Sequence, residues 1–128
     1  MVLADDHQTI LEKLTRLLEP EYEIVGTAGD GQSLVATVTQ LRPEVLVTDI
    51  SMPISTGIEA VSKLKDSGCP SKVVFLTVHD DPDYVRACLA TGASGYVLKA
   101  RMLCDLPHAI REALEGRIFV SPLSPGPS

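Results

Sequence analysis

Five polar residues could carry out chemistry together, and each lies just after an expected strand: Asp5, Asp6, Asp49, Thr77 and Lys99. Three carboxylates held close together repel one another, and a divalent cation relieves that repulsion. With no His or Cys expected nearby, an all-oxygen cluster favours Mg²⁺ over zinc. A carboxylate beside Mg²⁺ can attack phosphorus, while an ammonium neutralises charge on the transferred group. The set is therefore suited to forming an aspartyl phosphate.

Each of these residues also has an ordinary structural explanation when it is taken alone. Paired aspartates after a strand often form a turn or cap a helix. An aspartate before Ser-Met-Pro is usually a loop residue, and a single lysine is usually a solvated surface charge. The prediction of function therefore depends on all five side chains meeting at one place, which requires a particular fold.

Apolar residues along the chain alternate between the spacing of strands and that of helices. The run Glu44–Thr48 is too continuously apolar to have a solvated face, as expected of a central parallel strand. Residues Ile10, Leu14 and Leu18 share one helical face. Strands are expected at residues 1–4, 22–25, 44–48, 73–76 and 95–98, and helices at 10–18, at 34–41, and after 56, 81 and 105.

Two of the expected helices begin with residues that satisfy free backbone N–H groups. Thr56 and Glu59 have the spacing of a capping box. Asp81 is an expected N-cap because Pro82 follows it, and proline is favoured in the first position of a helix. These signals place the starts of the third and fourth helices.

Glycine and proline predict two further boundaries. Residues 26–31 contain three glycines, which predicts a turn after the second strand. Pro107 is tolerated in the first turn of a helix, so the last helix is expected to begin near Asp105.

The order of elements is a strand followed by a helix, repeated five times with short connections. This order predicts an α/β fold in which a parallel sheet has helices on both faces. In such sheets, ligands bind at the carboxyl ends of the strands, where the five polar residues lie. One domain is expected over residues 1–120, and 121–128, rich in Ser and Pro, is expected to be a linker or tail.

Composition excludes several functional classes. The 128 residues carry a net charge of −6. This charge argues against a nucleic-acid or anionic-membrane surface, because binding to phosphates depends on clustered Lys and Arg. The three cysteines lack metal or redox spacing and are expected to be buried or incidental thiols. No leader or membrane-spanning run is found, so a cytoplasmic location is expected.

Four motifs resemble the receiver domains of two-component response regulators in order and spacing. The resemblance covers Val2 to about Val120. Three features are similar to the LuxR/NarL-type regulators in particular: His7 after the acidic pair, the stretch 92–99, and the stretch 117–122 (RIFVSP). The four motifs are LADDH at 3–7, VTDISMP at 47–53, LTVH at 76–79 and GASGYVLK at 92–99.

The resemblance implies a fold and a metal site. The fold would be the flavodoxin-like receiver fold, a doubly wound (βα)5 domain with a five-stranded parallel sheet in the order 2-1-3-4-5. Asp49 would be the phosphoacceptor. Asp5, Asp6 and Asp49 would hold Mg²⁺ together with the backbone carbonyl of Ser51.

The same resemblance assigns the remaining roles. Lys99 would pair with the phosphoryl group, Thr77 would be the hydroxyl drawn in after phosphorylation, and Tyr96 the aromatic side chain that moves with it. His79 borders the site, where it would either tune hydrolysis of the phosphoryl group or be a solvated loop residue.

A signalling domain rather than an enzyme is the function that the resemblance implies. The phosphodonor would be a sensor histidine kinase, and phosphorylation would promote association of two copies. Output would be transcription regulation through a DNA-binding domain outside these 128 residues, with no nucleic-acid or membrane binding by this domain itself.

Two other functions are weaker matches to the sequence. A phosphatase of the haloacid dehalogenase type needs a second aspartate two residues after the nucleophile, where this chain has Ser51. A flavodoxin-like FMN binder needs a phosphate-binding loop after the first strand, where Asp5 and Asp6 would repel the phosphate.

Overall fold

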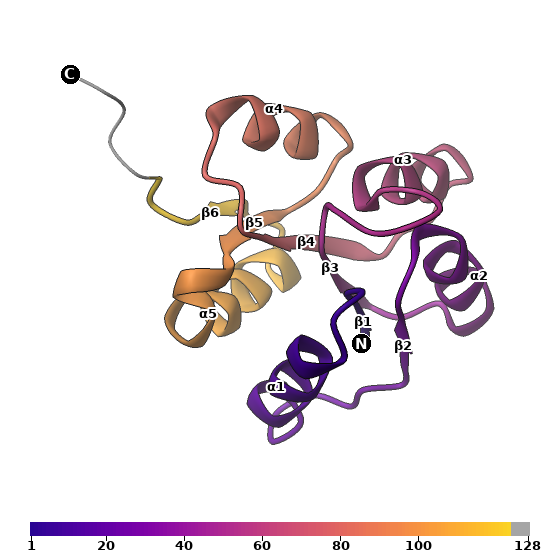
Figure 1. The fold of residues 1–128 in the computed structure, drawn as a ribbon, viewed down its shortest axis with the longest axis horizontal. Coiled ribbons are helices and arrows are strands. Elements are labelled where there is room, and N and C mark those ends of the chain that lie inside the picture. The colour runs from indigo at the N-terminus through magenta and orange to yellow at the C-terminus, as the bar shows by residue number, and fades with distance from the viewer. Residues whose placement is uncertain (124–128) are drawn as a thin grey trace.

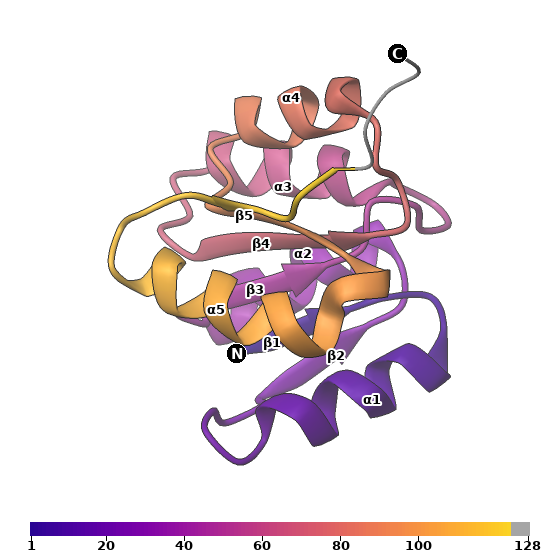
Figure 2. The ribbon, with the colours of Figure 1, turned by 90° about the vertical axis from the view of Figure 1, so that its left-hand side faces the viewer.

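A computed structural model describes residues 1–123 as a three-layer α/β domain (Figures 1 and 2). Helices α1 and α5 cover one face of a parallel sheet, and α2, α3 and α4 cover the other. The strands are β1 Val2–Ala4, β2 Gly26–Ala28, β3 Val45–Thr48, β4 Lys72–Thr77, β5 Gly95–Leu98 and β6 Phe119–Val120. The helices are α1 Gln8–Leu18, α2 Gly31–Leu41, α3 Gly57–Asp66, α4 Pro82–Ala90 and α5 Met102–Leu114, with a 3-10 turn at Lys99–Arg101.

The strand order is β2-β1-β3-β4-β5-β6, and every neighbouring pair is parallel. The predicted order of the first five strands is therefore confirmed. Every residue of β1, β3 and β5 is buried, which for β3 is what the continuous apolar run predicted. The core consists of two apolar clusters, one on each face of the sheet.

Both predicted helix caps are confirmed. The Thr56 hydroxyl accepts a hydrogen bond from the Glu59 N–H at 3.1 Å, and the Glu59 carboxylate accepts from the Thr56 N–H at 3.2 Å. The Asp81 side chain accepts from the Asp83 N–H at 2.8 Å, and Pro82 follows in the first turn of α4.

The predicted position of the second strand is wrong. Residues 22–25 form no strand, and β2 lies at Gly26–Ala28, within the predicted turn. A Cβ at Gly26 would lie 2.9 Å from Leu41 Cδ1 and 3.1 Å from Thr37 Cγ2 of α2. Gly26 therefore accommodates a closely packed helix rather than a turn.

The predicted start of the last helix is also wrong, because α5 begins at Met102 and Pro107 is its sixth residue. Buried Asp105 accepts hydrogen bonds from Arg101 Nε at 2.7 Å and from the Ser121 hydroxyl at 2.8 Å, which holds the first turn in place. The hydrogen bond from Arg101 also keeps the pKa of Asp105 below its usual range.

A sixth strand was not predicted, and it extends the sheet beyond β5. In β6, Phe119 pairs with Gly95, and Val120 pairs with Tyr96. In the region predicted to be a linker or tail, Ser121 is buried and its N–H donates to the Tyr96 carbonyl at 2.8 Å. Residues 124–128 of that region lie outside the described residues.

Helix α4 has fewer buried residues than the other α-helices, since Cys88 is its one buried residue. Cys69 is half-buried and Cys104 is exposed, and all three thiols are free. No helix within residues 1–123 combines the length and apolarity needed to span a membrane.

Candidate functional site

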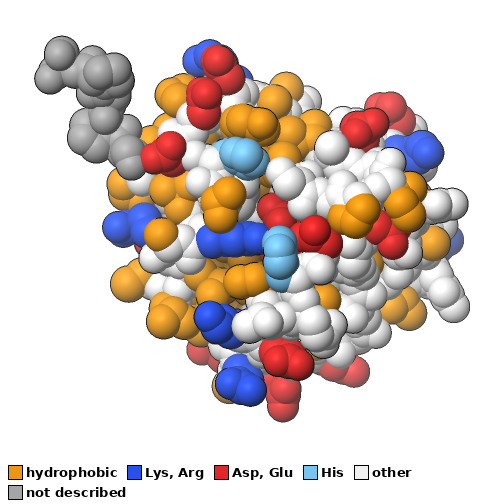
Figure 3. Space-filling view, in the orientation of Figure 1, with side chains coloured by type: hydrophobic (Ala, Val, Ile, Leu, Met, Phe, Trp, Pro, Cys, Tyr) orange, Lys and Arg blue, Asp and Glu red, His pale blue; other side chains and the backbone are white. Residues whose placement is uncertain are grey.

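The five polar residues predicted to act together follow four strands at the carboxyl edge of the sheet. Asp5 and Asp6 follow β1, Asp49 follows β3, Thr77 ends β4 and Lys99 follows β5. The face at this edge carries a small acidic patch near its centre, bordered by a histidine and a basic side chain (Figure 3). The parallel register therefore brings together residues that are up to 94 positions apart in the chain.

Lys99 joins two of the carboxylates directly. Its ammonium lies 2.8 Å from Asp5 Oδ2 and 3.0 Å from Asp49 Oδ2. Both carboxylates are buried and the lysine side chain is only 15% exposed, so these contacts are weakly screened by solvent. Such a cation can balance negative charge that is brought to Asp49.

Burial and charge oppose each other at this pair. Burial raises the pKa of Asp49, although the hydrogen bond and positive charge of Lys99 partly offset the increase. Burial by itself would lower the pKa of Lys99, but the contacts with Asp5 and Asp49 outweigh it, and that pKa lies above its usual value. Lys99 is therefore charged at neutral pH.

Backbone contacts fix the position of Asp49. Its N–H donates to the Ala4 carbonyl at 2.9 Å, and its Oδ1 accepts from the Ile50 N–H at 2.7 Å. Helix α3 begins against this segment, since a Cβ at Gly57 would lie 1.9 Å from the Asp49 carbonyl oxygen. A glycine at the start of α3 is thus needed for the loop after β3 to close.

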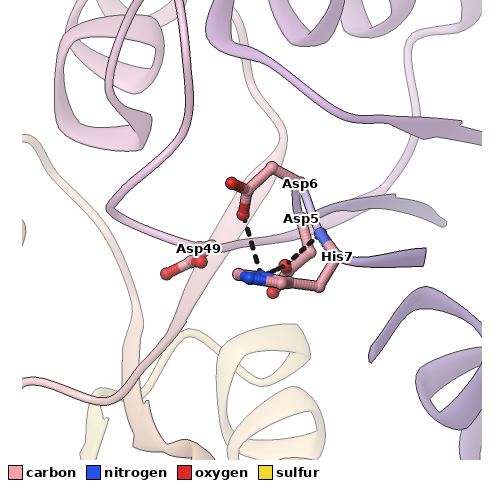
Figure 4. Close-up of side chains that lie close together, drawn as sticks. All are labelled: Asp5, Asp6, His7 and Asp49. Atoms are coloured by element: carbon pink, nitrogen blue, oxygen red, sulfur yellow. Dashed lines mark hydrogen bonds and ion pairs between the residues drawn. The ribbon is translucent and has the colours of Figure 1, made fainter. Parts of the chain in front are cut away.

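A histidine lies beside the acidic cluster, contrary to the expectation that no His is near it. His7 Nδ1 lies 3.1 Å from Asp5 Oδ1 and 3.0 Å from Asp6 Oδ1 (Figure 4). One ligand atom from each of Asp5, Asp6, His7 and Asp49 lies within 4.8 Å of the others. The expectation was wrong because the chain turns after β1 and brings the His7 side chain back beside the carboxylates.

The acidic residues fit a divalent cation. Apart from its ion pair with Lys99 at 2.8 Å, buried Asp5 Oδ2 has no hydrogen-bond partner among the described residues. A divalent cation at the cluster would give this oxygen a second positive partner and reduce the repulsion among the carboxylates. The side chain of Ser51 is exposed, and its hydroxyl is 3.2 Å from His79 Nε2.

The two predicted switch residues are linked through the backbone of His79, a connection that sequence reasoning missed. The His79 N–H donates to the buried Thr77 hydroxyl at 3.2 Å, and the buried Tyr96 hydroxyl donates to the His79 carbonyl. The His79 ring stacks on Tyr84 of α4 with ring centroids 4.2 Å apart. The spacing of Thr77 and His79 hinted at the first contact, but nothing in the sequence indicates the other two.

Comparison with known proteins gives matches over nearly the whole chain. The sequence pattern of the response regulator receiver domain matches residues 1–111. The chain is 39% identical over 124 residues to the transcriptional regulatory protein DegU of Brevibacillus brevis, covering 95% of this chain and 52% of DegU. It thus spans about half the length of that curated relative.

Solved structures agree with the sequence matches. A LuxR-family two-component response regulator from Aurantimonas sp. SI85-9A1 superposes with a TM-score of 0.90 at 30% identity, covering 94% of this chain and 88% of that one. The isolated receiver domain of RcsB from Salmonella enterica serovar Typhimurium, solved with the phosphomimetic BeF3−, gives a TM-score of 0.84 at 30% identity. That match covers 93% of this chain and 90% of the RcsB chain.

Proposed function

This chain belongs to the response regulator receiver domain family and is of the LuxR/NarL type, and from this premise we propose that Asp49 accepts a phosphoryl group from a sensor histidine kinase. The observation that carries the proposal is the Lys99 ammonium, which contacts both Asp5 and Asp49 at the carboxyl edge of the sheet. A cation between a buried carboxylate and its acidic neighbour is suited to balancing an incoming phosphoryl group.

In the proposed transfer, an oxygen of the ionised Asp49 carboxylate attacks the phosphorus of a phosphohistidine. The new P–O bond forms as the P–N bond breaks, and the departing imidazole keeps the bonding electrons and takes up a proton. Lys99 stabilises the charge on the phosphoryl oxygens. Because the domain catalyses only its own phosphorylation and dephosphorylation, it is a signalling domain rather than an enzyme acting on other substrates.

Asp5, Asp6 and Asp49 are the residues proposed to hold Mg²⁺, with the backbone carbonyl of Ser51. When bound, Mg²⁺ neutralises charge on the phosphoryl oxygens during transfer. The buried Oδ2 of Asp5, which has the Lys99 ion pair but no directed hydrogen bond among the described residues, supports a cation at this position.

The response to phosphorylation is proposed to pass from Thr77 to Tyr96. The Thr77 hydroxyl is free to donate to a phosphoryl oxygen while it accepts from the His79 N–H. Movement of Thr77 then shifts the backbone of His79. The His79 carbonyl accepts the hydrogen bond from the Tyr96 hydroxyl, and its ring stacks on Tyr84 of α4, so both contacts would change. The surface formed by α4 and β5 is therefore the proposed site of the change.

Output is proposed to be transcription regulation in the cytoplasm, through a DNA-binding domain joined to the receiver domain of residues 1–120. One of the similar solved structures contains two RcsB dimers bound to two parallel DNAs. This arrangement supports association of two copies as the step between phosphorylation and DNA binding.

The acceptor can be tested by mass spectrometry of the chain after incubation with acetyl phosphate, with and without Mg²⁺. One acid-labile phosphoryl group is expected on the wild type only with Mg²⁺, and none on Asp49→Asn. Asp66→Asn, which changes an exposed acid at the end of α3, is the matched control and should be labelled like the wild type. Undiminished labelling of Asp49→Asn would place the acceptor elsewhere.

A further inference from the structure

We propose that His7 supplies a nitrogen ligand to the metal site, so that the site binds imidazole-seeking cations such as Mn²⁺ and Co²⁺ more tightly than Mg²⁺. The inference rests on the proposed function, since it concerns the same cluster of carboxylates. It adds a residue and a cation preference that the three aspartates alone would not give.

The spacing of the ligand atoms matches a six-coordinate ion. With bonds of about 2.1 Å, an octahedral ion holds neighbouring ligands about 3.0 Å apart and opposite ligands about 4.2 Å apart. His7 Nδ1 lies 3.1 Å from Asp5 Oδ1 and 3.0 Å from Asp6 Oδ1, the separations expected of neighbouring ligands. The four-residue set with Asp49 lies within 4.8 Å overall, close to the span of opposite ligands.

The His7 ring has no other contact that accounts for its position. His7 is the N-cap residue of α1, yet its side chain makes no capping hydrogen bond. The side chain is 67% exposed, so burial against the core does not hold the ring in place. Its polar contacts are with Asp5 and Asp6, and the ring can therefore turn its nitrogen towards an ion between them (Figure 4).

A hydrogen bond from a protonated Nδ1 would also place the ring beside these carboxylates. The backbone N–H of His7 already donates to Asp5 Oδ1 at 2.9 Å, so a second donor from the same residue adds little there. Asp5 Oδ2, by contrast, has the ion pair with Lys99 at 2.8 Å and no well-directed hydrogen bond among the described residues. A cation with His7 as a ligand would contact the Asp5 carboxylate and balance the remaining acidic charge, whereas a hydrogen bond from His7 reaches Oδ1 alone.

Nitrogen ligation changes which cation is favoured. Imidazole suits transition metals, and affinity at a mixed nitrogen and oxygen site rises from Mn²⁺ to Co²⁺, whereas Mg²⁺ prefers oxygen ligands. Loss of the imidazole should therefore weaken Co²⁺ binding by roughly ten-fold. Mg²⁺ binding should stay the same or strengthen, because the carboxylates are then free of the ring.

Electron spin echo spectroscopy of Mn²⁺ bound to the full chain tests the ligand directly. Wild-type protein is expected to show modulation from a coordinated nitrogen, and His7→Ala is expected to lack it. His108→Ala, which removes a half-exposed histidine paired with Glu112 on α5, is the matched control and should keep the signal. Absence of nitrogen modulation in the wild-type spectrum would overturn the proposal whatever the stability of the variant, and loss of the modulation in His7→Ala assigns the nitrogen to His7.

Calorimetric titration with Mg²⁺, Mn²⁺ and Co²⁺ separates this inference from the proposed function. Mn²⁺ bound without nitrogen modulation, or equal Co²⁺ affinity in His7→Ala and wild type, would overturn the role of His7 while the aspartate site stands. Failure of wild-type protein to bind any of the three cations would overturn both.

Discussion

At the scale of single residues, burial of Asp49 destabilises the ionised carboxylate that the proposed phosphoryl transfer requires, and Lys99 offsets part of this effect. Lys99 keeps a compensating charge beside a carboxylate that burial disfavours in its ionised form. Ionised Asp49 is nonetheless the form that can attack phosphorus. The site therefore holds a reactive group in a state that the rest of the fold must stabilise.

The pKa of Asp49 gives a stability prediction with a definite sign. A carboxyl group whose pKa is raised by folding stabilises the protein below its unfolded pKa, and this contribution is lost as pH rises through the folded pKa. Asp49→Asn should therefore raise Tm at about pH 7 in metal-free buffer, and the gain should shrink towards about pH 4. Thermal unfolding with a chelator at both pH values measures this. A variant less stable than wild type at neutral pH would show that the Lys99 contact outweighs burial.

At the scale of helices and strands, α5 contains a proline that weakens it. The first four N–H groups of a helix have no acceptor within it, so Pro107, the sixth residue, removes one hydrogen bond, to the Leu103 carbonyl. We expect Pro107→Ala to raise the free energy of unfolding by about 2 kcal/mol. Urea unfolding provides the measurement.

Pro82→Ala is the control for that substitution. Pro82 occupies the first turn of α4, where its missing N–H has no helical acceptor. Its replacement should change the free energy of unfolding by less than about 0.5 kcal/mol. Equal effects at the two prolines would mean that the lost hydrogen bond in α5 is not what destabilises the helix.

Local patterns predicted most elements, and the errors fall where packing decides the outcome. The capping residues Thr56 and Asp81 act within one turn of chain, so the sequence carried their signal. Gly26 lies in a strand because α2 packs against it, and a distant Leu41 is not visible in a local pattern. The two-residue strand β6 is too short to have a periodicity, and its pairing with β5 depends on the tertiary fold.

The candidate site was predictable in part for the same reason. The five residues follow apolar strands, so the parallel sheet alone brings them to one edge. The position of the His7 ring depends on the turn after β1, and the stack of His79 on Tyr84 depends on how α4 packs. Neither is encoded in spacing along the chain.

At the scale of the whole molecule, net charge limits what this chain binds by itself. With 11 basic and 17 acidic residues, the net charge of −6 provides no electrostatic gain from phosphates. The 128 residues alone should therefore give no change in fluorescence anisotropy of a labelled DNA duplex at about 150 mM salt. Binding that weakens as salt rises would contradict the charge argument.

Because Cys88 is the one buried residue of α4, chemical labelling of its thiol reports when this helix separates from the sheet. Cys88 is fully buried, and burial raises its pKa to about 12, so it reacts with thiol reagents only while the helix is lifted from the sheet. Exposed Cys104 supplies an internal reference for a thiol that reacts freely. The ratio of the two labelling rates then gives the fraction of time that α4 spends open, which is the free energy of a local opening rather than of global unfolding. Because Tyr84 of this helix stacks on His79, the same ratio measures whether a ligand at the acidic edge changes the opening.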